Sequence, residues 1–271
     1  MTSAARAARA FEPAPGAGGL RALERALLIY RRIWRGTLFA SFFSPILYLA
    51  AMGLGLAGYI DPAAAARLPG GSYLAFLGPG LIAAQAMQVA TFECAYPLLG
   101  QIVWNRSFDA MLATPLRVRD LLFGHLAYVS FRVLIACCAF LVALLLFGGV
   151  PSATVLLTLP VAVLTGLAFA GPITAFSATQ KTDSGFASIF RFVITPLFVF
   201  SGTFFPVEQL PAVLQPIAWL TPLYHGVALA RGLALGTADP LGAVVHLAVL
   251  AAYAIVGTVA AGILLRRRLV A

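Results

Sequence analysis

Long apolar runs without charged side chains are the feature that most limits how this chain can fold. Thr37–Gly58 and Ser152–Phe176 carry no charged residue, and a helix needs about 20 consecutive apolar residues to cross a bilayer. Six apolar runs follow one another along the chain, three of them uncharged and three with a single charged residue: Thr37–Gly58, Tyr73–Leu99, Leu126–Phe147, Ser152–Phe176, Ile189–Phe205 and Leu241–Leu265. We therefore predict an all-α polytopic membrane protein with six transmembrane helices.

The composition supports this prediction. The chain is 61% hydrophobic and only 10% charged, whereas charged residues make up about a quarter of a typical soluble protein. Cys94, Cys137 and Cys138 all lie inside apolar runs, so we interpret them as small buried side chains rather than as metal ligands or disulfide partners. The excess of apolar surface is expected to face lipid.

The positions of the cations predict an orientation. Of the 18 cations, 17 are arginine. With the N-terminus in the cytoplasm, fifteen cations fall on the cytoplasmic side, two (Arg67 and Arg231) fall outside, and Arg132 lies within a span. Cytoplasmic loops carry the excess of arginine and lysine in membrane proteins. We predict a multi-pass protein of the bacterial inner membrane with both termini in the cytoplasm. Because this topology accounts for the net charge of +9, we predict no nucleic-acid partner.

Three parts are expected along the chain. Residues 1–35 form a cytoplasmic tail that ends in an amphipathic helix, 36–265 form the transmembrane domain, and 266–271 form a second cytoplasmic tail. In Leu20–Arg35, apolar side chains alternate with arginines, which is typical of a helix lying on the inner leaflet. An ordinary cytoplasmic extension is the alternative.

A proline-rich stretch between the last two spans is expected to contain re-entrant helices. The apolar segments Leu210–Leu220 and Leu223–Leu235 are too short to span a bilayer. Pro206, Pro211, Pro216 and Pro222 punctuate them, and His225 belongs to the same predicted re-entrant stretch. The alternative is an extracellular cap that never enters the lipid.

Two charged residues lie more than one helical turn inside the ends of predicted spans, whereas Arg191 stands at the cytoplasmic edge of its span. Glu93 and Arg132 would each sit about 9 Å deep at 1.5 Å per residue, at the same level on neighbouring antiparallel helices. Charges in a bilayer usually pair or face a cavity. We predict an ion pair that closes an intracellular gate; the alternative is that each side chain reaches separately for the headgroups.

Further polar and aromatic residues are candidates for a substrate path. They are Gln85, Gln88, Thr91, Ser201, Phe204 and Phe205. The polar ones could equally join helices to one another by hydrogen bonds.

Common catalytic motifs are absent from the sequence. A nucleotide-binding P-loop requires a lysine after a glycine-rich loop, and the only lysine, Lys181, follows Ala178-Thr179-Gln180. The three histidines stand far apart and form no H-E-x-x-H motif. Ser201 and His246 could be imagined as a serine protease pair, but such pairs are common by chance. We therefore predict no catalytic, cofactor or metal site in this chain.

Two stretches resemble the ABC-2 type transporter permeases, most closely the branch of nodulation protein J, lipo-oligosaccharide export and drug resistance. Arg106-Ser107-Phe108-Asp109-Ala110-Met111-Leu112-Ala113-Thr114-Pro115-Leu116, with Arg119-Asp120 after it, is similar to the family's loop after the second span. Phe200-Ser201-Gly202-Thr203-Phe204-Phe205-Pro206, followed by Leu220-Thr221-Pro222-Leu223-Tyr224-His225, is similar to the end of its fifth span. The resemblance covers nearly the whole chain after Arg21.

The resemblance implies a type V exporter fold and a permease subunit that forms a homodimer. It would pair with two copies of an ATP-binding cassette subunit, which would bind the ATP and magnesium. The loop would be the element that couples the permease to the ATPase, through Arg106, Thr114, Pro115, Leu116, Arg117, Arg119 and Asp120. A passive connector is the alternative.

The implied substrate is amphipathic or lipid-linked: a lipo-oligosaccharide, a glycolipid or a hydrophobic drug. Spans rich in small and apolar residues suit such a cargo better than an ion. A gradient-driven secondary transporter would usually show inverted repeats or midplane acids, and neither is visible. A lipid-modifying membrane enzyme would need a cluster of acids or histidines, and Glu93 stands alone.

Overall fold

Helices make up the structure, a computed structural model that describes residues 17–56, 59, 61, 66–148 and 152–270. No strand occurs in these residues, which confirms the predicted all-α class. A helix satisfies its backbone hydrogen bonds within one segment, as apolar surroundings require. Residues 1–16 of the predicted N-terminal part (1–35), the end of the first predicted span (57–58) and residue 271 lie outside the described residues.

Four helical segments are long and apolar enough to cross a membrane: Tyr73–Trp104, Val118–Leu146, Thr154–Thr179 and Pro240–Val270. The first joins α4 (Tyr73–Cys94), α5 (Tyr96–Leu99) and η3 (Gly100–Trp104). The second is α7 (Val118–Leu146), and the third contains most of η4 (Ala153–Leu157) and α8 (Thr158–Thr179). The fourth is α13 (Pro240–Val270). They coincide with the second, third, fourth and sixth predicted spans, so the chain is a polytopic membrane protein.

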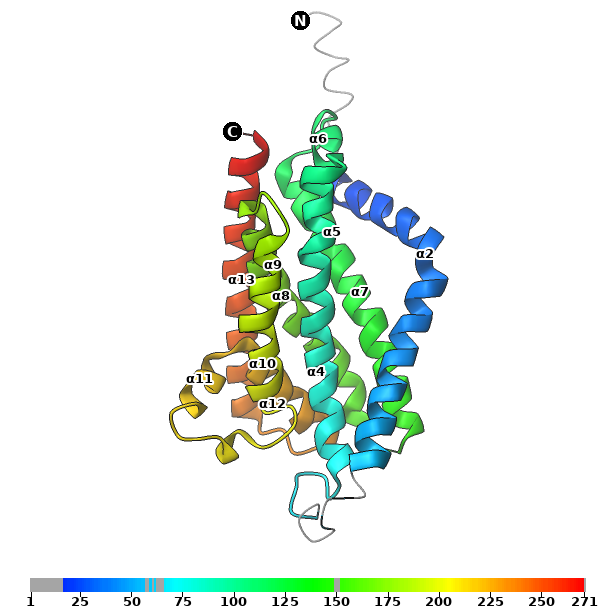
Figure 1. The fold of residues 1–271 in the computed structure, drawn as a ribbon, viewed down its shortest axis with the longest axis vertical. Coiled ribbons are helices and arrows are strands. Elements are labelled where there is room, and N and C mark those ends of the chain that lie inside the picture. Colours follow the sequence, from blue (N-terminus) through cyan, green and yellow to red (C-terminus); the bar gives the residue numbers. More distant parts are fainter. Residues whose placement is uncertain (1–16, 57–58, 60, 62–65, 149–151, 271) are drawn as a thin grey trace, which may run out of the picture.

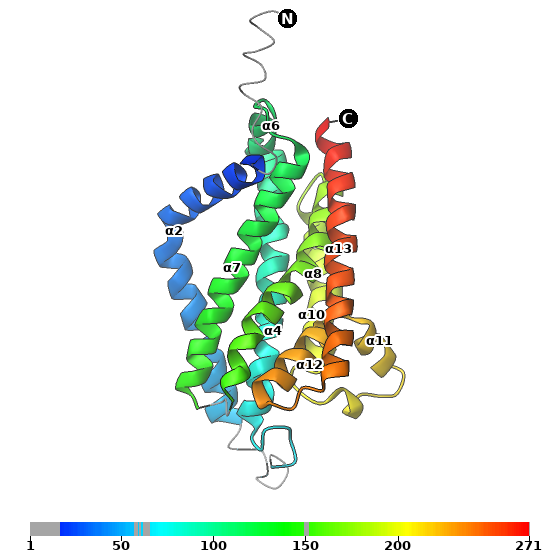
Figure 2. The same cartoon turned by 180° about the vertical axis from the view of Figure 1, so that it is seen from behind.

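The other two predicted spans are less regular. The first lies in α2 (Ala17–Leu49) and the π-helical η1 (Ala50–Leu56). α2 runs through residue 35 without interruption and changes direction part-way (Figures 1 and 2), so the expected boundary between tail and membrane domain falls inside one helix. The fifth is a shorter apolar helix, Ser184–Phe200, built from α9 (Ser184–Ile189), η5 (Phe190–Ile194) and α10 (Thr195–Phe200). Six spans remain a prediction.

The long α4 segment lies at the centre of the bundle. α2 and α7 stand on one side of it, and α8 and α13 on the other (Figures 1 and 2). The start of α2, the short α6 (Ser107–Leu112) and the end of α13 lie at one end, and α11 (Gln215–Leu220) and α12 (Pro222–Leu235) lie at the other. Most of α4 is buried, whereas α13 leaves Val245, Ile255 and Val259 exposed, as expected for a helix that faces lipid.

Small residues allow two pairs of helices to approach closely. Where α8 meets α13, a Cβ atom added to Gly171 would lie 2.7 Å from the Gly257 carbonyl carbon, and one added to Gly257 would lie 2.2 Å from Pro172 Cδ. At the other side of the bundle, a Cβ atom on Gly124 of α7 would lie 2.6 Å from Ala22 Cβ of α2. Close approach at small residues is how helices associate in membranes, where burial of apolar surface gives little drive.

Candidate functional site

Polar side chains follow one face of the rod that α4, α5 and η3 form. Gln85, Gln88, Glu93, Gln101 and Asn105 lie along it, and Asn105 ends η3. With Val89, Phe92 and Pro97 included, each residue of this series except the last is followed by another three to five positions further along the chain. Residues three or four positions apart share a helix face. We call these five polar residues the α4 polar stripe.

Two cavities adjoin the α4 polar stripe. The α10 cavity, of about 410 Å³, is lined by Gln85, Gln88, Val89, Phe92, Glu93, Arg132, Phe190, Ile194, Thr195 and Phe198. The α2 cavity, of about 480 Å³, lies under the first half of α2 and is lined on the α4 side by Phe92, Glu93, Pro97, Gln101 and Asn105. Phe92, Glu93 and Arg132 line both cavities. The two cavities therefore follow each other along α4 and meet at these three residues.

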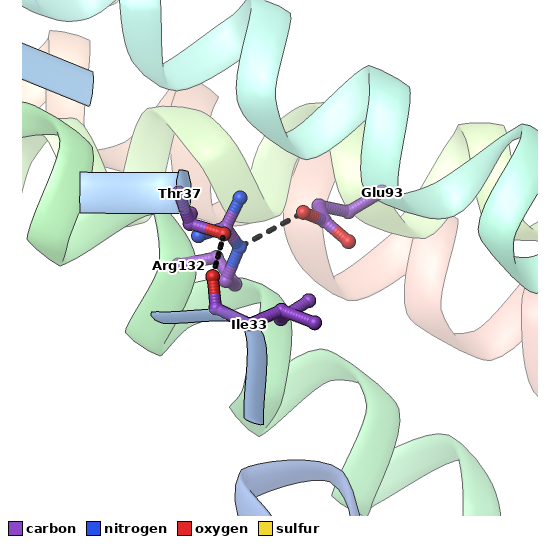
Figure 3. Close-up of polar contacts among 4 residues, drawn as sticks. All are labelled: Ile33, Thr37, Glu93 and Arg132. Carbon is purple, nitrogen blue, oxygen red and sulfur yellow. Dashed lines mark hydrogen bonds and ion pairs between the residues drawn. The ribbon is translucent and has the colours of Figure 1, made fainter. Parts of the chain in front are cut away.

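An ion pair stands at this meeting point. Arg132 Nε of α7 donates a hydrogen bond to Glu93 Oε1 of α4 at 2.9 Å, and both side chains are largely buried. On the α2 side, the Arg132 guanidinium lies 5.3 Å from the centre of the Tyr30 ring, within the range of a cation–π contact. Figure 3 shows the pair beside Ile33 and Thr37 of α2. The contact thus joins three helices, and its role as a gate stays a prediction.

The other predicted path residues are distributed differently. Thr91 is fully buried and lines neither cavity. The Ser201 hydroxyl hydrogen-bonds to the Thr203 hydroxyl at 3.0 Å and borders a separate, mainly apolar cavity between α10 and α11. Phe204 packs edge-on against Phe198 at 5.0 Å, and Phe205 packs on the cluster around Val207. The structure therefore brings Gln85 and Gln88 to the ion pair, but not the other four.

Gln101 and Asn105 are stripe residues that sequence reasoning did not select. The second span was expected to end at Leu99, so both were assigned to a loop. The helix continues to Trp104 because the π-helical turn η3 extends it. The spacing of four between Pro97, Gln101 and Asn105 is the signal that could have revealed the continuous face.

The predicted coupling loop is a compact turn between η3 and α7. Arg106 precedes α6 with a left-handed φ of 45°. After α6, the Thr114 hydroxyl donates to the Met111 carbonyl at 2.6 Å, and the Arg117 backbone N–H donates to Asp120 Oδ2 at 2.9 Å where α7 begins. This last bond satisfies an orphan group at the helix start. Pro115 and Arg119 are exposed, and Leu116 is half-buried.

A basic groove separates this loop from the end of α13. It encloses about 810 Å³ and is lined by Leu112, Leu116, Arg117, Val118, Arg119, Arg266, Leu269 and Val270. Three arginines surround an apolar floor. Such a surface can bind a partner that offers acidic side chains around an apolar knob.

Comparison with known proteins gives the family. The sequence profile described as "ABC-2 type transporter" matches residues 20–235. Over 258 residues, the chain is 34% identical to nodulation protein J of Rhizobium leguminosarum bv. viciae, covering 95% of this chain and 97% of the relative. It is 32% identical to nodulation protein J of Rhizobium meliloti (strain 1021), covering 95% and 96%. The chain belongs to the ABC-2 type transporter family. It is similar as well to nodulation protein J of Bradyrhizobium diazoefficiens, at 31% identity over 91% of this chain and 92% of the relative.

In this ABC-2 transporter chain, the proline-rich stretch folds at the end of the bundle opposite the start of α2 and the end of α13 (Figure 1). Pro206 starts the 3₁₀ turn η6 (Val207–Gln209), Pro211 is exposed in the turn after it, and Pro222 opens α12. Proline suits the first helical position because its missing N–H would lack a partner there anyway. α12 packs on α4 and α8. Whether the stretch enters lipid stays a prediction.

His225 connects the proline-rich stretch to α13 by a hydrogen bond. Its Nε2 lies 2.9 Å from the Trp219 carbonyl, and its Nδ1 lies 2.8 Å from His246 Nδ1. A carbonyl only accepts hydrogen bonds, so His225 Nε2 carries the proton and His225 Nδ1 accepts from His246. The hydroxyl of Tyr253 on α13 donates to the Leu220 carbonyl at 2.9 Å. Both contacts tie α11 and α12 to α13.

Arg231, which was predicted only to lie on the outer side of the membrane, joins three parts of the structure. It lies in α12, and its guanidinium donates to the carbonyls of Phe76 at 2.9 Å and Gly202 at 2.8 Å. A third donor–acceptor distance, to the Thr203 carbonyl, is 3.3 Å. Burial lowers the pKa of Arg231 to about 10, so it keeps its charge at neutral pH. The side chain joins α12, α4 and the turn after α10, and counting of charges could not have shown these carbonyl partners.

Proposed function

We propose that this chain is the transmembrane permease subunit of an ATP-binding-cassette exporter. It moves an amphipathic or lipid-linked substrate, such as a lipo-oligosaccharide, a glycolipid or a hydrophobic drug, out of the cytoplasm or the inner leaflet. Two copies of the chain pair with two copies of a separate ATP-binding subunit, which binds ATP and magnesium. The proposed location is the bacterial inner membrane, with six spans and both termini in the cytoplasm.

The α4 polar stripe is the observation that carries this proposal. Polar side chains on a membrane helix are costly to bury and usually mark a substrate path. Here residues of the stripe line two successive cavities. Apolar side chains such as Phe92 and Phe198 line the first of these cavities beside them. A path of mixed character suits a cargo with a polar head and an apolar tail.

The orientation of the chain is supported by where its arginines lie. The start of α2, the α6 loop and the end of α13 share one end of the bundle (Figure 1). This end holds Arg106, Arg117, Arg119 and the arginines at 266–268, and cytoplasmic faces carry such an excess. The basic groove at this end is the proposed docking surface of the ATP-binding subunit.

The Glu93–Arg132 pair is the proposed intracellular gate. It stands where the α2 cavity meets the α10 cavity, so cargo that passes from one to the other must displace it. Tyr30 contacts Arg132 from α2, which gives a movement of α2 a direct means of opening the pair.

Assembly and coupling test the proposed function. The chain is co-expressed with the ATP-binding subunit, purified as a complex, and assayed for ATP hydrolysis in liposomes with and without a lipo-oligosaccharide. We expect stimulated hydrolysis in the complex. In Leu116→Glu we expect stimulation to fall by about tenfold, the equivalent of 1.4 kcal/mol, because the change places a charge at a half-buried apolar position in the lining of the basic groove. Thr182→Glu, an exposed change in another loop, is the matched control. ATP-independent export driven by an ion gradient would contradict the proposal.

A further inference from the structure

The α2 cavity has a polar wall at the end of the bundle that holds the start of α2 and the end of α13. α2 covers it with Arg25, and η3, α6 and α7 contribute Gln101, Ser107, His125 and Tyr128. The first half of α2 leans on α7 at Gly124 and so forms the roof. On the same helix, Ile29 and Ile33 line the cavity while about half of each side chain stays exposed.

Two polar atoms of this wall are buried without a hydrogen-bond partner among the described residues. They are His125 Nε2 and Ser107 Oγ, and His125 is only 8% exposed. Among the described residues, the other buried side-chain polar atoms without a hydrogen-bond partner belong to Tyr30, Thr91 and Thr174. These three residues do not line the cavity. A buried polar atom without a partner costs about 1–3 kcal/mol, so two such atoms in one cavity need an explanation.

The charges of the lining indicate the kind of group that would satisfy them. Arg25, Arg132 and Glu93 line the cavity. Since Glu93 is paired with Arg132, the lining keeps a net positive charge through Arg25. A serine hydroxyl can donate a hydrogen bond, as can the Nε2–H tautomer of histidine. A cation with two donors matches an anionic oxygen group, because hydrogen bonds to charged acceptors are the strong ones.

We propose that the α2 cavity binds the anionic head group of an amphiphile that enters from the membrane leaflet beside α2. His125 Nε2 and Ser107 Oγ donate hydrogen bonds to the head group, Arg25 balances its charge, and the apolar chain lies along Ile29 and Ile33. The inference rests on the proposed function in one respect, that the amphiphile is the cargo at its first binding position, directly before the Glu93–Arg132 pair.

Lipid binding tests the inference without ATP or the partner subunit. The full chain is placed in phosphatidylcholine nanodiscs and titrated with a fluorescent phosphatidylglycerol. We expect saturable binding that weakens at least tenfold in Arg25→Gln and in His125→Leu, and severalfold in Ser107→Ala. Arg21→Gln removes an exposed cation of the same helix, and Thr174→Val removes a buried hydroxyl without a partner elsewhere; both should bind as the unmodified chain does. The melting temperature shows whether each variant is folded. If His125→Leu does not fold, Ser107→Ala still tests the cavity.

Three results would overturn the inference. Equal binding by fluorescent phosphatidylcholine would show that the negative charge is not recognised. Competition by soluble glycerol phosphate at the same concentration as the lipid would show that a free anion, and not an amphiphile, is the ligand. Unchanged affinity in all three cavity variants would show that water alone fills the cavity. ATP-driven export that persists in any of these cases would leave the proposed function intact and remove only this site.

Discussion

Two regions of the bundle differ in how closely their helices pack. Where α13 crosses α8, the two backbones meet at Gly171 and Gly257. Between α2, α4 and α7, the helices enclose a cavity and an ion pair. The first contact leaves no room for a methyl group. The second holds polar groups that are only partly satisfied. Close-packed contacts resist deformation, whereas elements that move are drawn from less stable regions. The start of α2 is also close-packed, against Gly124 of α7. We infer that α8 and α13 form the fixed part of the subunit and that the part of α2 beyond this contact moves against α4 and α7.

The largest effect is expected at the glycine contact. In Gly257→Ala the new methyl group would lie 2.2 Å from Pro172 Cδ, and overpacking of this kind costs about 1–3 kcal/mol or more. We expect a clear fall in melting temperature in detergent. Gly262→Ala is the matched control on the same helix, because the nearest side-chain atom to its new methyl group is 3.5 Å away. Equal effects of the two changes would show that α8 and α13 are not tightly packed.

An effect of similar size is expected at Arg231. Arg231→Met leaves the Phe76 and Gly202 carbonyls without their charged donor, and such hydrogen bonds contribute about 1.5–3 kcal/mol. We expect faster proteolysis around the turn after α10 together with a lower melting temperature. Arg67→Gln, at an exposed arginine, should change neither. If Arg231→Met is as stable as the unmodified chain, this side chain does not stabilise the end of the bundle that holds α11 and α12.

The ion pair should give the smallest effect on stability. Removing one partner of a deeply buried pair costs about 3–5 kcal/mol, but polar cavities on both sides of this pair should relieve much of the loss. We expect Glu93→Gln and Arg132→Gln each to lower the melting temperature slightly. The double variant should lose less than the sum of the single losses. Strictly additive losses would show that the two side chains do not interact in the membrane.

The α8–α13 side of the molecule was easier to predict from sequence than the α2 side. Uncharged or weakly charged runs near 20 residues identified α4, α7, α8 and α13, because length and hydropathy decide whether a helix can span. The spacing of Glu93 and Arg132 also placed them at one level, where the structure joins them. The cavities on the α2 side form between helices that are far apart in the sequence. A local sequence pattern does not contain the packing angles of these helices.

Two features of the structure were not predicted. The carbonyl partners of Arg231 were missed because a tally of charges does not include backbone acceptors, and these carbonyls come from residues 28 to 155 positions away. Gln101 and Asn105 were missed because the second span was expected to end at Leu99. The chain instead continues through α5 and η3 after a local irregularity at Ala95.

The accessibility of the α4 polar stripe to water tests most directly whether it is the path of the cargo. Cys94, Cys137 and Cys138 are first replaced by alanine. Single cysteines are then introduced by Gln88→Cys, Gln101→Cys and Thr91→Cys, and reaction with a charged methanethiosulfonate reagent is timed in the complex with the ATP-binding subunit. We expect the two stripe positions to react at least tenfold faster than the buried Thr91 position, with ATP changing the rate at Gln88→Cys. Equal rates at all three positions, with no response to ATP, would contradict a path along α4.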